Sequence, residues 1–256
     1  MSQLLESQGK FVSEVPVQMT TSSTCLVLLP GLLCDAFVWE AQCEAISFVD
    51  CFIPSYGDLS SITSMARHVL DTAPAELLYL AGHSMGGRVA LEIARQAPNR
   101  VQRMALLDTG MDPIVPGEPG AAERAKRMAL LEVAKSQGMR KMGRDWARGM
   151  VHPSQLDSPL FEQILEMIER QTPETFLSQI TALLGRPDAR AVLAGLQCPT
   201  MFLCGRQDVW SPLSRHEEMH AMVSGSSLVV IEDSGHMTTM EQPLAVSRAL
   251  INWLRS

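Results

Sequence analysis

Short apolar runs and longer amphipathic stretches alternate along most of this chain. Runs rich in Val, Leu and Ile predict buried strands at residues 24–29, 48–53, 77–81, 101–107, 199–204 and 227–231. Between them, apolar positions at helical spacing predict helices that begin near residues 36, 61, 85, 213 and 243. Strands that are apolar throughout are typical of a parallel sheet covered on both faces. The pattern therefore predicts an α/β fold with a mostly parallel central sheet flanked by helices.

The alternation stops at residue 111 and resumes near residue 198. The intervening sequence is rich in Met, Arg and Glu and predicts helices at 119–136, 138–150, 159–170 and 173–184. We expect residues 111–197 to form a helical cap inserted into a core made of residues 1–110 and 198–256. Apolar cap residues are candidates either for a pocket lining or for packing between the cap helices: Met128, Met139, Met142, Trp146, Met150 and Phe161. Residues 1–23 predict at most one or two short edge strands, interrupted by Pro16.

The composition is that of a globular, acidic protein. Of its 256 residues, 46% are hydrophobic, which is enough for a sizeable core, and the net charge is -7. The sequence shows no basic run suited to a phosphate backbone, no export signal and no apolar run of membrane-spanning length. We therefore expect a cytoplasmic protein that binds neither nucleic acid nor membranes. Its six cysteines form no C-x-x-C pair, which predicts buried free thiols, no metal site and no cofactor.

One serine stands where the hydrophobic period changes from that of a strand to that of a helix. Residues 82–86 read Gly-His-Ser-Met-Gly, between a predicted strand and a predicted helix. A serine hydroxyl is a weak nucleophile, so it needs a nearby base and gains from the positive end of a helix. The two glycines leave room around a strained turn, and the backbone N–H of Met85 is placed to donate to a developing oxyanion. The pattern predicts Ser84 as a nucleophile.

The sequence Gly-His-Ser-Met-Gly-Gly resembles the nucleophile elbow of the alpha/beta-hydrolase superfamily, and the resemblance covers nearly the whole chain from residue 24. It implies the alpha/beta-hydrolase fold, with an inserted cap that covers the active site. It also implies a second oxyanion N–H in the loop after the first strand, which reads Pro30-Gly31-Leu32 here. Pro30 replaces the histidine that is usual in the superfamily, but the next two residues match. The role therefore falls on the backbone of Leu32.

A nucleophilic serine requires a histidine base and a carboxylate that orients the imidazole. Asp208 and His236 each follow a predicted strand, in the chain order Ser, Asp, His that is expected for this fold. Ligand-facing residues of such sheets lie just beyond the strand carboxyl ends. Asp108 also follows a strand and is the alternative acid. His83 and His68 are interpreted as structural histidines.

These residues predict a serine hydrolase that cleaves a small, fairly apolar carboxylic ester through an acyl-enzyme on Ser84. Perhydrolysis without a cofactor and acyl transfer to an alcohol use the same residues and stay open. C–C bond hydrolysis of ring-cleavage products is another alternative, although those relatives typically carry Asn and an aromatic residue where this chain has His83 and Met237. Cys34 is an alternative reactive thiol. A ligand-binding receptor with degraded catalysis is the non-enzymatic alternative.

Overall fold

The fold is built on one parallel sheet. The computed structural model describes residues 24–256, so the edge strands expected within residues 1–23 lie outside the described residues. Six strands in the described part pair in parallel in the order β2-β1-β3-β4-β5-β6. Their bounds are β1 (Thr24–Leu29), β2 (Cys51–Phe52), β3 (Leu77–His83), β4 (Val101–Leu107), β5 (Thr200–Gly205) and β6 (Ser227–Ile231). The parallel pairing brings all their carboxyl ends to one edge of the sheet.

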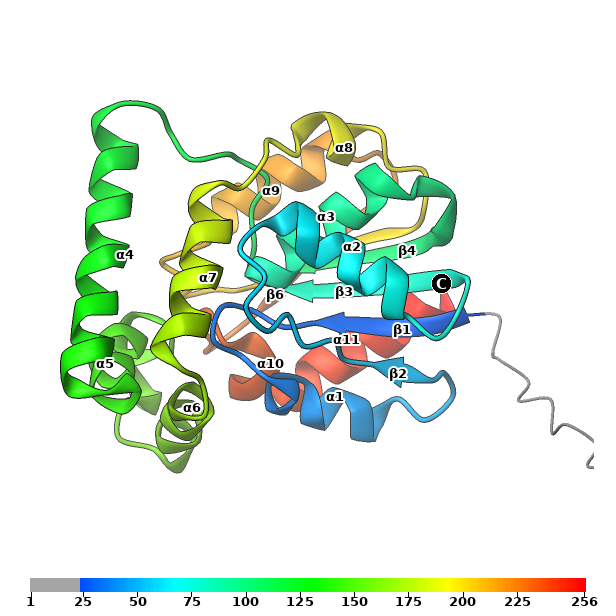
Figure 1. Cartoon of the computed structure of the whole chain (residues 1–256). Coiled ribbons are helices and arrows are strands. Elements are labelled where there is room, and N and C mark those ends of the chain that lie inside the picture. The colour runs from blue at the N-terminus through cyan, green and yellow to red at the C-terminus, as the bar shows by residue number, and fades with distance from the viewer. Residues whose placement is uncertain (1–23) are drawn as a thin grey trace, which may run out of the picture.

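Helices cover both faces of this sheet (Figure 1). One face carries α2 (Ile62–Thr72), α3 (Met85–Gln96), α8 (Arg190–Ala194) and α9 (Leu213–Met222). The other face carries α1 (Glu40–Ala45), α10 (Thr238–Glu241) and α11 (Pro243–Arg255). Between these layers the strand side chains Leu26, Leu80 and Leu106 are completely buried. Burial on both sides explains why the strands are apolar throughout rather than alternating with polar residues.

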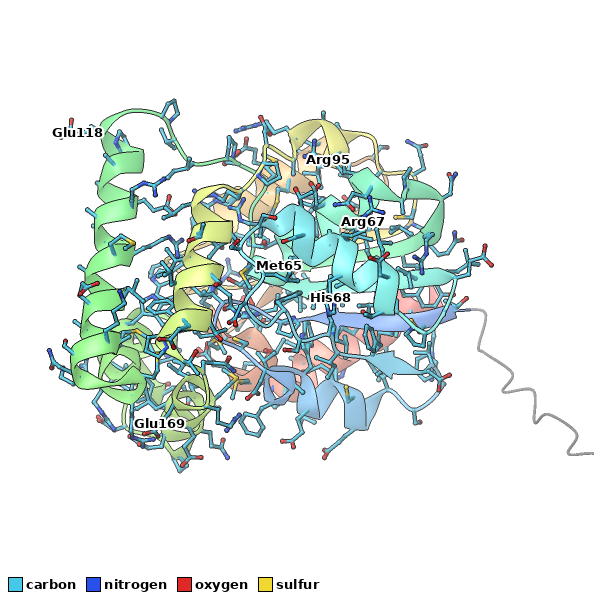
Figure 2. The ribbon with its side chains drawn as sticks, viewed as in Figure 1. Met65, Arg67, His68, Arg95, Glu118 and Glu169 are labelled. Carbon is cyan, nitrogen blue, oxygen red and sulfur yellow. The ribbon has the colours of Figure 1, made fainter. Side chains whose placement is uncertain are left out.

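Four further helices lie beyond the carboxyl ends of the strands (Figure 1). They are α4 (Glu118–Gln137), α5 (Met139–Trp146), α6 (Pro159–Glu169) and α7 (Pro173–Leu184), close to the predicted bounds. The hydroxyls of Ser158 and Thr172 cap α6 and α7, and each is followed by a proline in the first turn. Figure 2 marks Glu118 and Glu169, the first residue of α4 and the last residue of α6, at opposite ends of this layer.

Two features depart from the sequence-based expectation. The strand expected at 48–53 is reduced to Cys51–Phe52, because within residues 24–256 it lies at the sheet edge and pairs only with β1, while Phe48 is 50% exposed. The second difference concerns the end of the 111–197 segment. There, α8 packs against α3 and α9 rather than against α4–α7, so it belongs to the layer on the sheet.

Candidate active site

Ser84 lies in a sharp turn between β3 and α3. Its φ is 55° and its ψ is -115°, a strained conformation for a residue with a side chain. The flanking glycines have no space for a Cβ, which at Gly82 would lie 2.4 Å from the carbonyl oxygen of Gly86, and at Gly86 2.1 Å from that of Leu29. The turn therefore presents Ser84 at the N-terminus of α3, where the helix dipole favours negative charge.

Ser84, His236 and Asp208 form a hydrogen-bonded chain. His236 Nε2 lies 2.9 Å from Ser84 Oγ, and His236 Nδ1 lies 2.8 Å from Asp208 Oδ2. The other carboxylate oxygen of Asp208 accepts hydrogen bonds from the backbone N–H groups of Trp210 and Ser211, at 2.8 and 2.9 Å. With Nδ1–H donating to Asp208, Nε2 is left to accept the serine proton. The structure thus brings together the serine, histidine and acid that the sequence predicts.

The surroundings of Asp208 favour its charged form. Burial by itself would raise the pKa of this carboxyl, but His236 and the two backbone N–H donors hold the pKa below its ordinary value. Both side chains are almost completely buried, so water competes little with their hydrogen bond. An ionised Asp208 is suited to stabilise a positive charge on His236.

Asp108, the alternative acid, makes different contacts. Its carboxylate accepts hydrogen bonds from the Thr238 hydroxyl and from the backbone N–H of Gly205 at 3.0 Å. Complete burial and the nearby Asp208 raise the pKa of Asp108 well above its ordinary range. His83 donates from Nε2 to the carbonyl oxygen of His236 at 2.7 Å, and burial lowers the pKa of His83 to about 4. Through these contacts, Asp108 and His83 both stabilise the segment that carries His236.

The end of β5, three residues before Asp208, lies in close backbone contact with the loop that carries His236. A Cβ at Gly205, the last residue of β5, would lie 2.0 Å from the carbonyl oxygen of Gly235. We expect Gly205→Ala to lower the free energy of unfolding by about 1–3 kcal/mol, because backbone atoms must move to make room. Thermal and urea unfolding would measure this loss. Gly185→Ala is the matched control, since its Cβ would meet its nearest atom at an ordinary 3.5 Å; equal stabilities of the two variants would contradict the prediction.

The two N–H groups predicted for an oxyanion, those of Leu32 and Met85, donate to no acceptor within residues 24–256. The next residue, Leu33, has a φ of 59° and donates its own N–H to Gln179 Oε1 at 2.8 Å. Gln179 belongs to α7 and is 4% exposed. A cap helix therefore fixes the strained loop that carries Leu32.

A cavity of about 440 Å³ opens beside Ser84 and His236. Aromatic side chains form one part of its wall: Trp210 lies 5.1 Å from His236 and 5.2 Å from Trp146, measured between ring centroids. Of the cap candidates, Trp146 and Met150 line the cavity. The other candidates lie outside the lining: Met139, Met142 and Phe161 are buried in the hydrophobic core, and Met128 is 36% exposed.

Another part of the wall is charged, which the sequence reasoning missed. Its cations are Arg88, Lys126, Arg127, Arg186 and Arg215. Arg88 had a local signal, because it follows Ser84 by four residues on α3 and so lies one helical turn away on the same side. The others approach only through the packing of α4, α7 and α9. By contrast, His68, which Figure 2 labels, lies on α2 and does not line the cavity.

Cys34 also lines the cavity, but its thiol is held in the neutral form. Burial and the neighbouring Asp35 raise its pKa to about 12, and a neutral thiol is a poor nucleophile. No group of three or more His, Cys, Asp or Glu side chains suited to a metal ion occurs within residues 24–256. In the same part of the chain, every helix is too short or too polar to cross a membrane.

The fold has counterparts among known proteins. A sequence model described as the alpha/beta hydrolase family matches residues 26–249. The chain belongs to the alpha/beta hydrolase family. The pimeloyl-[acyl-carrier protein] methyl ester esterase of Nitrosomonas europaea is 25% identical to this alpha/beta hydrolase, over 91% of this chain and 96% of that protein.

Two further proteins extend this picture. The 2-hydroxy-6-oxononadienedioate/2-hydroxy-6-oxononatrienedioate hydrolase 2 of Pseudomonas putida is 27% identical over 74% of this chain and 66% of its own. A thermophilic esterase from Thermogutta terrifontis, solved with malate bound, superposes with a TM-score of 0.77 at 26% identity, over 92% of this chain and 90% of that one. This alpha/beta hydrolase is therefore a hydrolytic enzyme.

Proposed function

We propose that this enzyme cleaves a carboxylic ester through an acyl-enzyme on Ser84. The observation that carries the proposal is the hydrogen-bonded chain from Ser84 through His236 to Asp208, at 2.9 and 2.8 Å, with Ser84 and His236 in the wall of a cavity. The N–H groups of Leu32 and Met85, which have no acceptor in the described part of the chain, support it, because acyl transfer builds negative charge on the carbonyl oxygen. Esterases among the relatives and structural neighbours support the same reaction class.

The reaction has two halves. Ser84 Oγ attacks the ester carbonyl carbon while His236 Nε2 takes the hydroxyl proton, and the N–H groups of Leu32 and Met85 donate to the oxyanion. The C–O bond then breaks, and His236 returns the proton to the departing alcohol. Water then attacks the acyl-enzyme while His236 takes a proton from it. The bond between the acyl carbon and Ser84 Oγ breaks, the carboxylic acid leaves, and His236 returns the proton to Ser84 Oγ. Throughout, Asp208 holds the Nδ1–H tautomer and stabilises the imidazolium.

Reaction with a fluorophosphonate probe tests this proposal. An activated serine displaces fluoride from phosphorus, so we expect stoichiometric labelling of the purified protein and a modified peptide that contains Ser84. A chain-length series of 4-nitrophenyl esters should then show turnover that depends on acyl length. Intact protein that neither reacts with the probe nor hydrolyses any ester of the series would overturn the proposal.

C–C bond hydrolysis is the second candidate function. The Pseudomonas putida relative, named for a dienedioate substrate, favours it, and the same serine and histidine would serve such a reaction. Labelling of Ser84 without hydrolysis of any ester would move the assignment toward this class. Disappearance of the ultraviolet-visible absorbance of a 2-hydroxy-6-oxo-dienoate in the presence of the enzyme would then identify it.

Gln179 is expected to position the oxyanion loop. Gln179→Leu removes the acceptor of the Leu33 N–H, and a buried unpaired donor costs about 1–3 kcal/mol, so the loop should leave its strained conformation. We expect kcat on 4-nitrophenyl butyrate to fall about tenfold or more, and KM to change less, because the loop acts on the oxyanion rather than on the bound ester. Gln163→Leu on the exposed side of α6 is the control. A fall in stability with unchanged kcat would assign Gln179 a purely structural role.

A further inference from the structure

A basic cluster lies beside the proposed nucleophile. Its five cations come from the core and the cap alike, from α3, α4, α9 and the segment that follows α7 (Figure 1): Arg88, Lys126, Arg127, Arg186 and Arg215. The acidic side chains of the same lining are Glu123 and Asp108. This surplus of positive charge is local, whereas the whole chain carries a net charge of -7.

The two acidic side chains do not neutralise the cluster. Glu123 binds Arg186 through both oxygens, at 2.8 and 2.9 Å, and accepts from Arg127 at 3.0 Å. Burial alone would raise the pKa of Glu123, but these two arginines lower it to about 2, so Glu123 carries its single charge between them. Asp108 faces away, toward Thr238 and the backbone of Gly205. One carboxylate therefore forms ion pairs with two of the five cations.

The other arginines lack a carboxylate partner. Arg88 Nη1 donates to the backbone oxygen of Asp112 at 2.7 Å, and Arg215 Nη1 donates to that of Trp210 at 2.9 Å. Within residues 24–256 neither arginine forms an ion pair, and the Nη2 group of each has no acceptor. The two side chains meet over Gly110, where a Cβ would lie 3.3 Å from Arg88 Nη2 and 2.8 Å from Arg215 Cδ.

Burial and the neighbouring cations disfavour the charged form of Arg88. Burial, together with Arg186 and Arg215, lowers the pKa of Arg88 to about 9. Gathering like charges in a partly enclosed site is unfavourable unless an anion joins them. Glu123 joins Arg127 and Arg186, but no carboxylate within residues 24–256 forms an ion pair with Arg88 or Arg215, so a ligand is the remaining source of an anion for these two.

We propose that the cluster binds a carboxylate of the substrate, so that the enzyme acts on an ester that also carries a free carboxylate group. Guanidinium groups match the planar, bidentate geometry of a carboxylate. Ser84 and Arg88 are separated by one turn of α3, about 6 Å along the helix axis, so one small molecule in the cavity of about 440 Å³ can reach both. The reaction class rests on the proposed function, whereas the anion site stands on the cluster itself.

Matched esters test the proposal. Mono(4-nitrophenyl) adipate carries a carboxylate on the acyl chain, and 4-nitrophenyl 6-methylheptanoate replaces that carboxylate with an isopropyl group of the same shape. For the alcohol side, 3-acetoxybenzoate is compared with 3-isopropylphenyl acetate. We expect kcat/KM to favour the acid about tenfold or more in at least one pair, as a charge-assisted hydrogen bond would produce. Equal rates, or faster hydrolysis of both neutral esters, would overturn the proposal.

Variants locate the effect in the cluster. Arg215→Gln and Arg127→Gln should each reduce the preference for the acid over its neutral partner about tenfold, and Arg215→Lys should restore part of it. Arg124→Gln is the matched control, because Arg124 is an exposed residue of α4 outside the cavity lining. Expressing the result as a ratio removes any general loss of activity that follows from disturbing the Trp210 loop. A preference that survives both glutamine variants would contradict the assignment.

A binding measurement separates this proposal from the proposed reaction. Ser84→Ala protein, titrated with adipate in a calorimeter, is expected to bind it, and Ser84→Ala/Arg215→Gln protein is expected to bind it about tenfold more weakly. Adipate binding without hydrolysis of any ester by the wild-type enzyme would overturn ester cleavage and leave the anion site standing. Ester hydrolysis without adipate binding and without preference for either acid would do the reverse.

Discussion

Replacing Ser84 with alanine is expected to abolish ester hydrolysis. The substitution removes the atom that would form the acyl-enzyme. Any remaining hydrolysis would require direct attack by water on an ester whose carbonyl oxygen is held by the N–H groups of Leu32 and Met85. In another serine hydrolase, loss of the nucleophile lowers kcat by roughly 10⁶-fold. Steady-state hydrolysis of 4-nitrophenyl butyrate by wild-type and Ser84→Ala protein measures the loss, and fluorophosphonate labelling should disappear with it.

This loss must reflect chemistry rather than misfolding. Alanine keeps the Cβ of Ser84 and needs no other room in the turn, so the melting temperature of Ser84→Ala should stay near that of the wild type. Ser214→Ala, in the exposed part of α9, is a control for the substitution itself. A folded Ser84→Ala enzyme that keeps ester hydrolysis within tenfold of the wild type would exclude Ser84 as the nucleophile.

The parts of the site that could be predicted from the sequence are those set by consecutive residues or by the sheet. The conformation of Ser84 depends on Gly82, Gly86 and the start of α3, all within a few residues. Asp208 and His236 are distant in sequence, but each follows a parallel strand, and such strands end at one edge of the sheet. Local pattern and topology together were enough to place these side chains near one another.

The cavity wall depends on how helices pack, and periodicity does not determine that. A methionine at helical spacing, such as Met142, fits equally well against another helix or against a ligand, and in the structure it is buried in the core. Arg127, Arg186 and Arg215 belong to three segments with no shared motif. These side chains line one cavity because the cap lies over the carboxyl ends of the strands. The expectation of a fairly apolar ester came from the apolar cap residues alone and could not include this charged wall.

The identity of the acid is the second result with a large expected effect. Asp208→Asn should lower kcat by about 10⁴-fold, as the same change does in the triad of a serine protease, because an amide no longer enforces the Nδ1–H tautomer of His236. Asp108→Asn should keep kcat within about tenfold of the wild type. The raised pKa of Asp108 favours its neutral form, and an asparagine oxygen can still accept from the N–H of Gly205.

The comparison is informative because the two carboxyls are close enough to affect each other's titration, yet only Asp208 contacts the imidazole of His236 through a hydrogen bond. Fluorophosphonate labelling rates of the two variants, measured beside kcat, report on activation of Ser84 independently of deacylation. If Asp108→Asn lost more activity than Asp208→Asn while both proteins kept their melting temperature, Asp108 would be the acid. His236 would then have to adopt a different orientation during catalysis, since in this structure its Nδ1 is directed at Asp208.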